Sequence, residues 1–201
     1  MTESYVFKEH PAQAAGAPTL ALFHGTGGDE NQFFALGRQL LPSARLIAPR
    51  GDVSEGGALR YFRRTGEGVY DMDDLRQRTD KMANFLRSVK TDGKLVGLGY
   101  SNGANILAAV MFAYPDLIDA AVLMHPLIPW QPEPVEGLKD RKVLITAGRR
   151  DPICPAPQTQ ALADWFAAQG TATEVVWHEG GHEIVQAELV AAARFLSGQQ
   201  A

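Results

Sequence analysis

The sequence contains a single cysteine, Cys154, so no disulfide can form within the chain. It has no apolar run of the length that a bilayer-spanning helix needs. Residues 1–10 are polar and mixed in charge, without the basic and then apolar order of a secretory signal peptide. These absences predict a cytoplasmic protein that makes no contact with a membrane.

Charge of one sign is not concentrated anywhere along the chain. The 19 basic and 23 acidic residues give a formal net charge of −4, and no basic run stands out, so nothing predicts a nucleic-acid partner. Internal repeats and low-complexity tracts are also absent. Hydrophobic residues make up 45% and charged residues 21% of the 201 residues, which is ordinary for a globular protein. We expect one domain that spans residues 1–201 and buries a substantial core.

What the sequence does contain is an alternation of short apolar runs with longer helical patterns. The runs are nearly continuous in Val, Ile, Leu and Ala, which is typical of strands buried on both faces of a parallel sheet. The expected strands are 19–23, 44–48, 94–98, 120–124, 142–146 and 173–177, with 5–7 as a candidate edge strand. The expected helices are 31–41, 73–90, 102–113, 158–169 and 183–196. This order predicts an α/β fold with a mainly parallel sheet flanked by helices, and sites at the carboxyl ends of its strands.

The pentapeptide Gly99-Tyr100-Ser101-Asn102-Gly103 stands between an expected strand and an expected helix. Gly-x-Ser-x-Gly in that position is the pattern of a nucleophile elbow, a tight turn that exposes a reactive serine. Glycine is required on either side because a Cβ atom there would collide with nearby backbone. The start of the following helix favours negative charge near the serine. We expect Ser101 to be a catalytic nucleophile; the alternative is an ordinary serine in a glycine-rich turn.

A serine hydroxyl needs a base, usually a histidine that a carboxylate orients. In folds with this elbow the chain order is serine, then Asp or Glu, then His. Asp151 follows the expected strand 142–146, and His182 follows the expected strand 173–177 through two glycines. We therefore expect Asp151 to orient His182 as the base. Taken singly, Asp151 could be a turn or helix cap and His182 a surface histidine.

Other histidines fit the role of base less well. His178 is nearer its strand end and lacks the glycine lead, and His10 belongs to the polar N-terminal segment. His125 follows the expected strand 120–124 and could line the site, but it precedes Asp151 in the chain.

Acyl transfer passes through a tetrahedral oxyanion, which two backbone N–H groups can stabilise. One donor is expected from Asn102, the residue after the nucleophile. The other is expected from Thr26, within the glycine-rich segment 22–28 that follows an earlier strand. His24 is then a structural support of this loop. A phosphate-binding loop is the weaker interpretation, because neither Gly-x-Gly-x-x-Gly nor a following Gly-Lys-Ser/Thr is present.

Together these motifs resemble the phospholipase/carboxylesterase family, which includes the acyl-protein thioesterases and small bacterial esterases. The segments that carry the resemblance are 23–28, 99–103, 151–152 and 181–182, and it runs from about residue 20 to residue 196. It is closest to a bacterial branch that carries Ala-Pro-Arg-Gly, here 48–51, and Arg-Tyr-Phe-Arg-Arg, here 60–64.

The resemblance implies an α/β-hydrolase fold with a triad of Ser101, Asp151 and His182. It also implies Thr26 and Asn102 as the oxyanion donors, and no metal and no cofactor. The thioesterases usually carry Gln after the serine, where this chain has Asn102. They also carry a Trp-containing segment where this chain has residues 60–64, so the resemblance is stronger to the esterases.

The residues expected to shape the pocket come from two segments. Residues 51–70 follow the strand 44–48 and are expected to lie over the site, with Phe62, Arg63 and Arg64 as candidate substrate contacts. The two arginines suit a carboxylate or another anionic group, or they pair with nearby acidic side chains instead. Ile153 is a candidate for the acyl side of the pocket, or plain core.

The connection 125–142 is short and carries several prolines, which predicts a minimal cap or none. The expected function is hydrolysis of small carboxylic esters through an acyl-enzyme on Ser101. A thioesterase, a lactone hydrolase or a C–C bond hydrolase would use the same triad, and a catalytically silent binding module is the alternative from another class. Cys154 lies outside the elbow, which disfavours a cysteine nucleophile. The expected partner is a small-molecule ester, and the oligomeric state is left open, a homodimer included.

Overall fold

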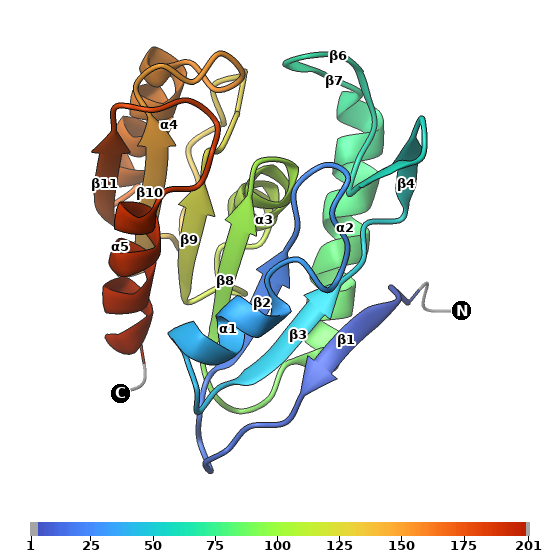
Figure 1. Ribbon diagram of the computed structural model, residues 1–201, viewed down its shortest axis with the longest axis vertical. Helices are drawn as coiled ribbons and strands as arrows, with labels where there is room; N and C mark the ends of the chain where they lie inside the picture. The colour runs from blue at the N-terminus through green and yellow to red at the C-terminus, as the bar shows by residue number, and fades with distance from the viewer. Residues whose placement is uncertain (1–3, 200–201) are drawn as a thin grey trace.

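The computed structural model describes residues 4–199 around a seven-stranded sheet of order β1-β3-β2-β8-β9-β10-β11 (Figure 1). Neighbouring strands pair in parallel, except that β1 pairs antiparallel with β3 at one edge. The strands are β1 (Phe7–His10), β2 (Thr19–Phe23), β3 (Arg45–Pro49), β8 (Leu95–Tyr100), β9 (Ala120–Met124), β10 (Lys142–Gly148) and β11 (Ala172–His178). The expected α/β fold with a mainly parallel sheet is confirmed.

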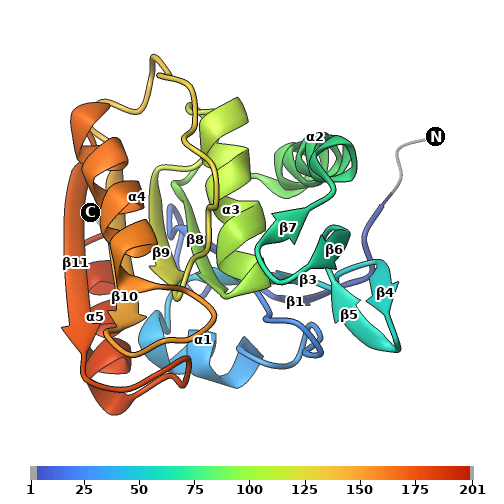
Figure 2. The same ribbon diagram turned by 90° about the horizontal axis from the view of Figure 1, so that it is seen from above.

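Helices cover both faces of this sheet (Figure 1, Figure 2). One face carries α1 (Phe34–Leu40) and α5 (Gln186–Ser197), and the other carries α2 (Met72–Val89), α3 (Asn102–Ala113) and α4 (Ala156–Ala168). Each face buries its own hydrophobic cluster between sheet and helices. Because the central strands are apolar on both sides, β2 and β9 are buried along their whole length. The sheet is therefore a rigid base for the loops at its carboxyl ends.

The edge strand differs from its expected position. It spans Phe7–His10 rather than residues 5–7, because Tyr5 turns into the core and packs edge-on against Phe85 at 5.5 Å between ring centroids. The last helix also begins later than expected, at Gln186 instead of Glu183. The Glu183 carboxylate accepts a hydrogen bond from the Gly181 amide, which holds this acidic residue in the preceding loop.

Residues 51–70 form two small hairpins rather than an irregular loop. The first pairs β4 (Val53–Glu55) with β5 (Ala58–Arg60), and the second pairs β6 (Arg64–Gly66) with β7 (Val69–Tyr70). The turns use glycines with φ of 57° and 93° at Gly56 and Gly57, and 67° at Gly68. Strands this short carry too few residues to show a period of two. The β6–β7 hairpin lies beside α2 and α3, and the β4–β5 hairpin lies farther from α3, at the outer edge of the molecule (Figure 2).

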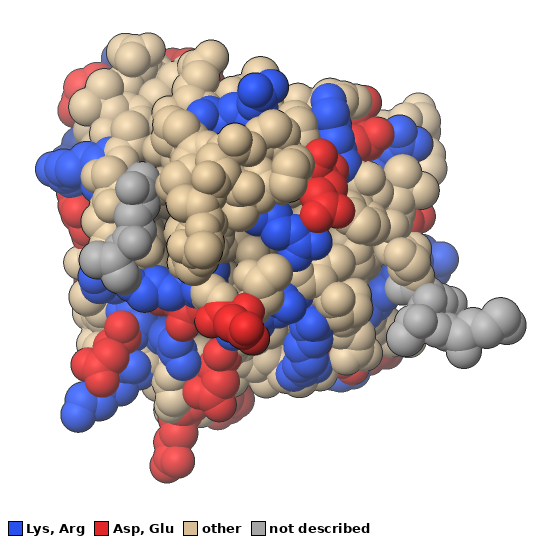
Figure 3. Space-filling view, turned by 90° about the horizontal axis from the view of Figure 1, so that it is seen from below, with Lys and Arg blue, Asp and Glu red and all other residues tan. Residues whose placement is uncertain are grey.

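The face opposite the carboxyl ends of the strands carries Lys and Arg interspersed with Asp and Glu (Figure 3). Neither sign dominates it, as the distribution of charges along the sequence predicts. Between residues 4 and 199, no helix combines the length and the apolar character that crossing a membrane requires.

Candidate functional site

Ser101 occupies the sharp turn between β8 and α3. Its backbone has φ 52° and ψ −117°, a conformation that residues other than glycine rarely adopt. A Cβ on Gly99 would lie 2.5 Å from the Gly103 carbonyl oxygen, and a Cβ on Gly103 would lie 2.3 Å from the Phe23 carbonyl oxygen. Both approaches are too close for any side chain. The glycines at these two positions are what lets the strained turn exist.

The turn brings Ser101 to His182 and Asp151, which follow β11 and β10. Ser101 Oγ lies 3.0 Å from His182 Nε2, and His182 Nδ1 lies 2.7 Å from Asp151 Oδ2. The other oxygen, Oδ1, accepts the amides of Ile153 at 2.8 Å and Cys154 at 2.9 Å. Burial alone would raise the pKa of Asp151, but these amides and the imidazole donors outweigh it and lower that pKa. The carboxylate is thus ionised and held in a fixed plane.

Tyr100 holds the loop that carries His182, a role that sequence reasoning missed. Its hydroxyl donates to the His182 carbonyl oxygen at 2.7 Å, and its ring packs on the imidazole with 5.3 Å between centroids. Burial raises the pKa of Tyr100 to about 12, so the phenol keeps the proton that it donates. The loop also touches β10 directly, because a Cβ on Gly148 would lie 2.1 Å from the Gly181 carbonyl oxygen. Tyr100 is the variable residue before the serine of the Gly-x-Ser-x-Gly motif, so the motif gives no sequence signal for this contact.

The candidate oxyanion donors lie on either side of Ser101. Asn102 begins α3, where a backbone amide has no acceptor within the helix. Thr26 lies in the loop after β2, where the amides of Gly27 and Gly28 donate to Leu59 and Gly25 at 3.0 Å each. The Thr26 amide stays outside these turn hydrogen bonds. Thr26, Ser101 and Asn102 line the same pocket.

His24 supports this loop and does not act near the serine. Its Nε2 accepts the Gly51 amide at 2.9 Å, so the neutral ring carries its proton on Nδ1 and donates to the Gly25 carbonyl at 2.7 Å. Burial lowers the pKa of His24, which keeps the ring neutral. The ring therefore ties the loop after β2 to the loop after β3, in agreement with the structural role expected for it.

The pocket at Ser101 is small, with a volume of about 20 Å³. Its walls come from the loop after β2, the hairpin segment, α3 and the loops after β9 and β10. The lining residues are Thr26, Arg60, Arg64, Glu67, Tyr70, Ser101, Asn102, Asn105, Leu127, Ile153 and Cys154. Two of the expected substrate contacts, Arg64 and Ile153, are thus at the pocket.

The other two expected contacts lie elsewhere, which corrects the prediction for them. Phe62 is fully buried in the core and packs edge-on against Tyr70 at 4.8 Å between ring centroids. Arg63 points its largely exposed side chain toward Asp74, 3.8 Å away, on the outside of the hairpin segment. Both residues lie between β5 and β6, outside any strand, so no regular period sets the direction of their side chains.

Arg60, which the prediction left out, is the arginine that reaches the loop of Thr26. Its guanidinium is almost fully buried, and Nη1 donates to Thr26 Oγ1 at 2.7 Å. Arg64 is held by two carboxylates, with Nη1 2.6 Å from Glu67 Oε2 and Nε 3.0 Å from Glu55 Oε2. The pairing of arginines with acidic neighbours, which the sequence left open, therefore applies to both, to Arg64 through Glu67 and Glu55 and to Arg63 through Asp74.

Two polar side chains of α3 fix the pocket walls. Asn102 Oδ1 accepts the Tyr61 amide at 2.8 Å and so anchors the hairpin segment. Asn105 donates to the Tyr70 hydroxyl at 2.9 Å and accepts the Leu127 amide at 2.7 Å. Neither contact has a sequence signal beyond two asparagines at i and i+3, one helical turn apart.

A second imidazole–carboxylate chain lies buried behind the triad. His125 Nδ1 lies 2.9 Å from Asp151 Oδ2, and His125 Nε2 lies 3.0 Å from Glu188 Oε1 on α5. Glu188 also accepts the Thr146 hydroxyl at 2.6 Å and the Val185 amide at 2.7 Å. The imidazole and carboxylate atoms here are close enough to ligate a metal ion. The hydrogen bonds and ion pairs already present account for their spacing without one.

This buried chain predicts a pH-dependent stability. Burial would raise the pKa of Glu188, but its hydrogen bonds outweigh that effect and lower the pKa. A lowered folded-state pKa adds stability that is present above the unfolded value, about 4.3, and is lost as pH falls through the folded value. We expect the free energy of unfolding, measured with urea, to fall by about 1–3 kcal/mol between pH 6 and pH 3. Glu188→Gln should flatten this slope, whereas the exposed-site control Glu133→Gln should not; equal slopes in all three proteins would contradict the prediction.

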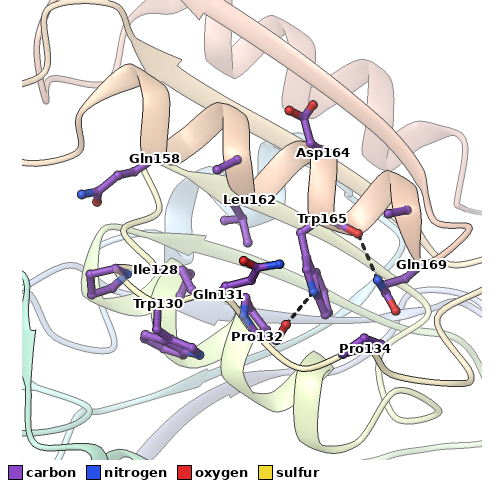
Figure 4. Close-up of a pocket in the computed structure, with 13 residues that line it drawn as sticks. Ile128, Trp130, Gln131, Pro132, Pro134, Gln158, Leu162, Asp164, Trp165 and Gln169 are labelled. Carbon is purple, nitrogen blue, oxygen red and sulfur yellow. Dashed lines mark hydrogen bonds between the residues drawn. The ribbon is translucent and has the colours of Figure 1, made fainter.

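A larger cavity of about 570 Å³ lies between α4 and the proline-rich connection after β9 (Figure 4). Trp130, Leu162 and Trp165 give it an apolar lining, and Trp165 Nε1 donates to the Pro132 carbonyl at 2.9 Å. It shares no lining residue with the pocket at Ser101. The two are therefore separate hollows of the protein.

The dienelactone hydrolase family model matches residues 59–187, which carry Ser101, Asp151 and His182. The chain belongs to the dienelactone hydrolase family. MhqD of Bacillus subtilis (strain 168) is 38% identical over 174 residues, 84% of this chain and 87% of that protein. A carboxylesterase from Bacillus cereus superposes with a TM-score of 0.93 at 31% identity, covering 97% of this chain and 94% of its own. Atu2452 from Agrobacterium tumefaciens str. C58, of unknown function, gives a TM-score of 0.94 at 56% identity, covering 99% of each chain.

These relatives confirm the likeness inferred from the motifs. The protein is a hydrolase of the dienelactone hydrolase and carboxylesterase type, with an α/β-hydrolase fold. The connection after β9 contains no helix among its residues, 125–141, which agrees with the minimal cap expected from its length.

Proposed function

We propose that this dienelactone hydrolase family member cleaves small carboxylic esters through an acyl-enzyme on Ser101. The observation that carries the proposal is the 3.0 Å contact from Ser101 Oγ to His182 Nε2, on a turn whose strained backbone exposes the serine. A hydroxyl at hydrogen-bond distance from an imidazole, with a carboxylate behind the imidazole, is the arrangement that activates a serine.

In the first half-reaction, Ser101 Oγ attacks the ester carbonyl carbon and His182 Nε2 takes the hydroxyl proton. The tetrahedral intermediate collapses when His182 returns this proton to the leaving alcohol oxygen, and the acyl group stays on Ser101. In the second half, His182 deprotonates a water molecule that attacks the acyl carbon, and the proton then goes to Ser101 Oγ. Asp151 keeps the imidazole in the tautomer with a proton on Nδ1 throughout.

Charge develops on the carbonyl oxygen in both halves, and the backbone amides of Thr26 and Asn102 are the proposed donors to it. The site favours that charge for two further reasons. The first turn of α3 points its free amides toward this region, and Arg60 holds the Thr26 side chain at 2.7 Å. Loss of one such donor typically costs about 10²–10³-fold in kcat.

The size of the pocket supports short acyl groups. A volume of about 20 Å³ holds little more than one water molecule. We expect kcat/KM for p-nitrophenyl esters to fall by at least about tenfold from acetate to octanoate, since each methylene that the pocket excludes stays in water. A rising series would contradict the proposed pocket. Ile153→Ala should reduce the discrimination between these chain lengths, whereas Ile184→Ala, outside the pocket lining, should leave it unchanged.

The family name refers to a lactone, which is a cyclic ester that the same steps would open. A direct test is therefore to trap the intermediate with two probes, p-nitrophenyl acetate and an unsubstituted lactone.

Rapid mixing of the enzyme with p-nitrophenyl acetate should release p-nitrophenol in a burst of one equivalent per enzyme. Acid quenching should leave an acetyl group on the tryptic peptide that carries Ser101. Acetyl on another residue would overturn the mechanism, and neither burst nor turnover with any ester, thioester or lactone would favour a silent binding module.

A further inference from the structure

His125 lies at the centre of a buried cluster that the proposed reaction does not use. Its side chain is completely buried, as are those of Asp151 and Glu188 on either side of it. The backbone of His125 has φ 49°, in the left-handed region. That conformation is held by the His125 amide, which donates to the Thr146 carbonyl at 2.8 Å, and by Cys154 Sγ, which donates to the His125 carbonyl at 3.2 Å.

Both carboxylates beside His125 are ionised by their other contacts. Asp151 receives two backbone amides on Oδ1 and the His182 imidazole on Oδ2. Glu188 receives a hydroxyl on Oε1 and a backbone amide on Oε2. Each carboxylate therefore accepts a donor on both of its oxygens, and hydrogen bonds of this kind favour the ionised form.

A neutral imidazole cannot satisfy both neighbours. It has one N–H and one lone pair, so one of its nitrogens would place a lone pair about 3 Å from a carboxylate oxygen. The contact from Nε2 to Glu188 is moreover poorly aligned for a hydrogen bond, so charge attraction is what makes it favourable. A doubly protonated ring donates to Asp151 and pairs with Glu188 at once.

The remaining groups that face His125 do not supply a competing charge. Tyr100 on β8 presents its ring edge at 5.8 Å between centroids and keeps its phenol proton. His178 at the end of β11 accepts the Gly180 amide on Nδ1, and its Nε2 lies 3.5 Å from Glu188 Oε2. His182 is the other imidazole near the cluster, with 5.1 Å between the ring centroids.

We propose that His125 is a positioning residue that stays an imidazolium through the catalytic cycle, locked between Asp151 and Glu188, and that its charge beside Asp151 tunes the pH dependence of catalysis by His182. The positive ring of His125 and the ring of His182 both contact Asp151 Oδ2. Glu188 lies on the other side of His125, so the positive ring stands between Glu188 and His182 in the chain of contacts. A positive charge beside an imidazole opposes its protonation, so the charge of His125 affects the pH at which His182 can act as a base.

The pKa directions agree with this arrangement. Burial would lower the pKa of His125, but the close contacts with Glu188 and Asp151 and the negative charges of both outweigh burial and raise it. A raised folded-state pKa gives stability that is complete below the unfolded value, about 6.5, and is lost as pH rises through the folded value. The contribution of His125 to the free energy of unfolding should therefore decrease as the pH rises through its folded-state pKa.

The charge state can be measured on the wild-type protein, independently of any substrate. Two-dimensional proton–nitrogen spectra of the histidine rings distinguish an imidazolium from both neutral tautomers. We expect one ring, identified by its absence from His125→Asn, to be an imidazolium at pH 7.5. In Glu188→Gln the same ring should lose its proton at a pH lower by at least about one unit. A neutral His125 ring at pH 7.5 in the wild type would overturn the proposal, whatever the enzyme hydrolyses.

The effect on His182 requires activity and so rests on the proposed function. Asparagine at 125 tolerates the left-handed backbone and keeps a donor where Nδ1 lies, but it removes the charge. We expect the acidic limb of the kcat/KM profile to move to higher pH by about 0.5–1 unit in His125→Asn. His10→Asn, at the far edge strand, should leave it unchanged. If the acidic limb stays in place in a His125→Asn protein that folds and reacts with a fluorophosphonate, His125 does not tune the pH dependence of catalysis. If the wild-type protein itself does not react with the fluorophosphonate, the result counts against the proposed function instead.

Discussion

Replacing Ser101 with alanine is expected to lower kcat for p-nitrophenyl acetate by about 10⁴–10⁶-fold, while the protein folds as before. The loss is large because Oγ is the only atom of the side chain that reacts, and the base and oxyanion donors cannot act without it. Alanine removes this one atom and adds no clash to the turn. The measurement is steady-state hydrolysis, with labelling by a fluorophosphonate probe as a second readout.

Ser197→Ala is the matched control, because Ser197 is an exposed serine at the end of α5. It should retain full turnover and full labelling. Thermal melting of both variants should stay within about 1–2 °C of the wild type. Equal turnover by Ser101→Ala and Ser197→Ala would remove Ser101 from the mechanism, even though the elbow itself would stand.

Gly103→Ala is expected to have the largest effect on stability, a loss of about 3–5 kcal/mol or failure to fold. The added methyl group would lie 2.3 Å from the Phe23 carbonyl oxygen and 2.5 Å from that of His24. Both are backbone atoms at the end of a buried central strand, so neither can rotate away as a side chain would. Relief requires that α3 move off the sheet and take the Ser101 turn with it.

Gly66→Ala provides the contrast. Its new Cβ would find its nearest neighbour at 3.8 Å, and Gly66 does not need a positive φ. We expect a change of less than about 1 kcal/mol in urea unfolding for this variant. Comparable losses at both positions would mean that helix or strand propensity, and not the close approach of α3 to β2, sets the requirement for glycine at 103.

The sequence predicted the parts of the site that follow from chain order. Ser101, Asp151 and His182 each come just after a strand of a parallel sheet, and such strands end at one edge, so their order alone brings the three residues near one another. The role of the glycines in the elbow and in the loop at Thr26 could be predicted for a related reason. Each marks a close backbone approach that any other residue would prevent.

The parts that could not be predicted depend on side-chain direction in short or irregular segments. Phe62 and Arg63 lie beside residues that do line the pocket, yet one enters the core and the other faces solvent. The flanking strands have three residues each, which is too short for a hydrophobic period that would show which side chains face the core. The pairing of His125 with Glu188 could not be predicted for another reason, because it joins residues 63 positions apart with three elements, β10, α4 and β11, between them.

The parallel pairing of β9 with β10 has a consequence for how the protein can be divided into two fragments. Ser101 and the loops of Thr26 and Asn102, which hold the proposed nucleophile and oxyanion donors, precede the connection 125–141. Asp151 and His182 follow it. Residues 133–137 of that connection are exposed or half-buried. A cut there separates a fragment that carries Ser101 from a fragment that carries Asp151 and His182. The two fragments would pair through the parallel strands Ala120–Met124 and Lys142–Thr146. Recovery of ester hydrolysis on mixing the two fragments would then measure their reassembly.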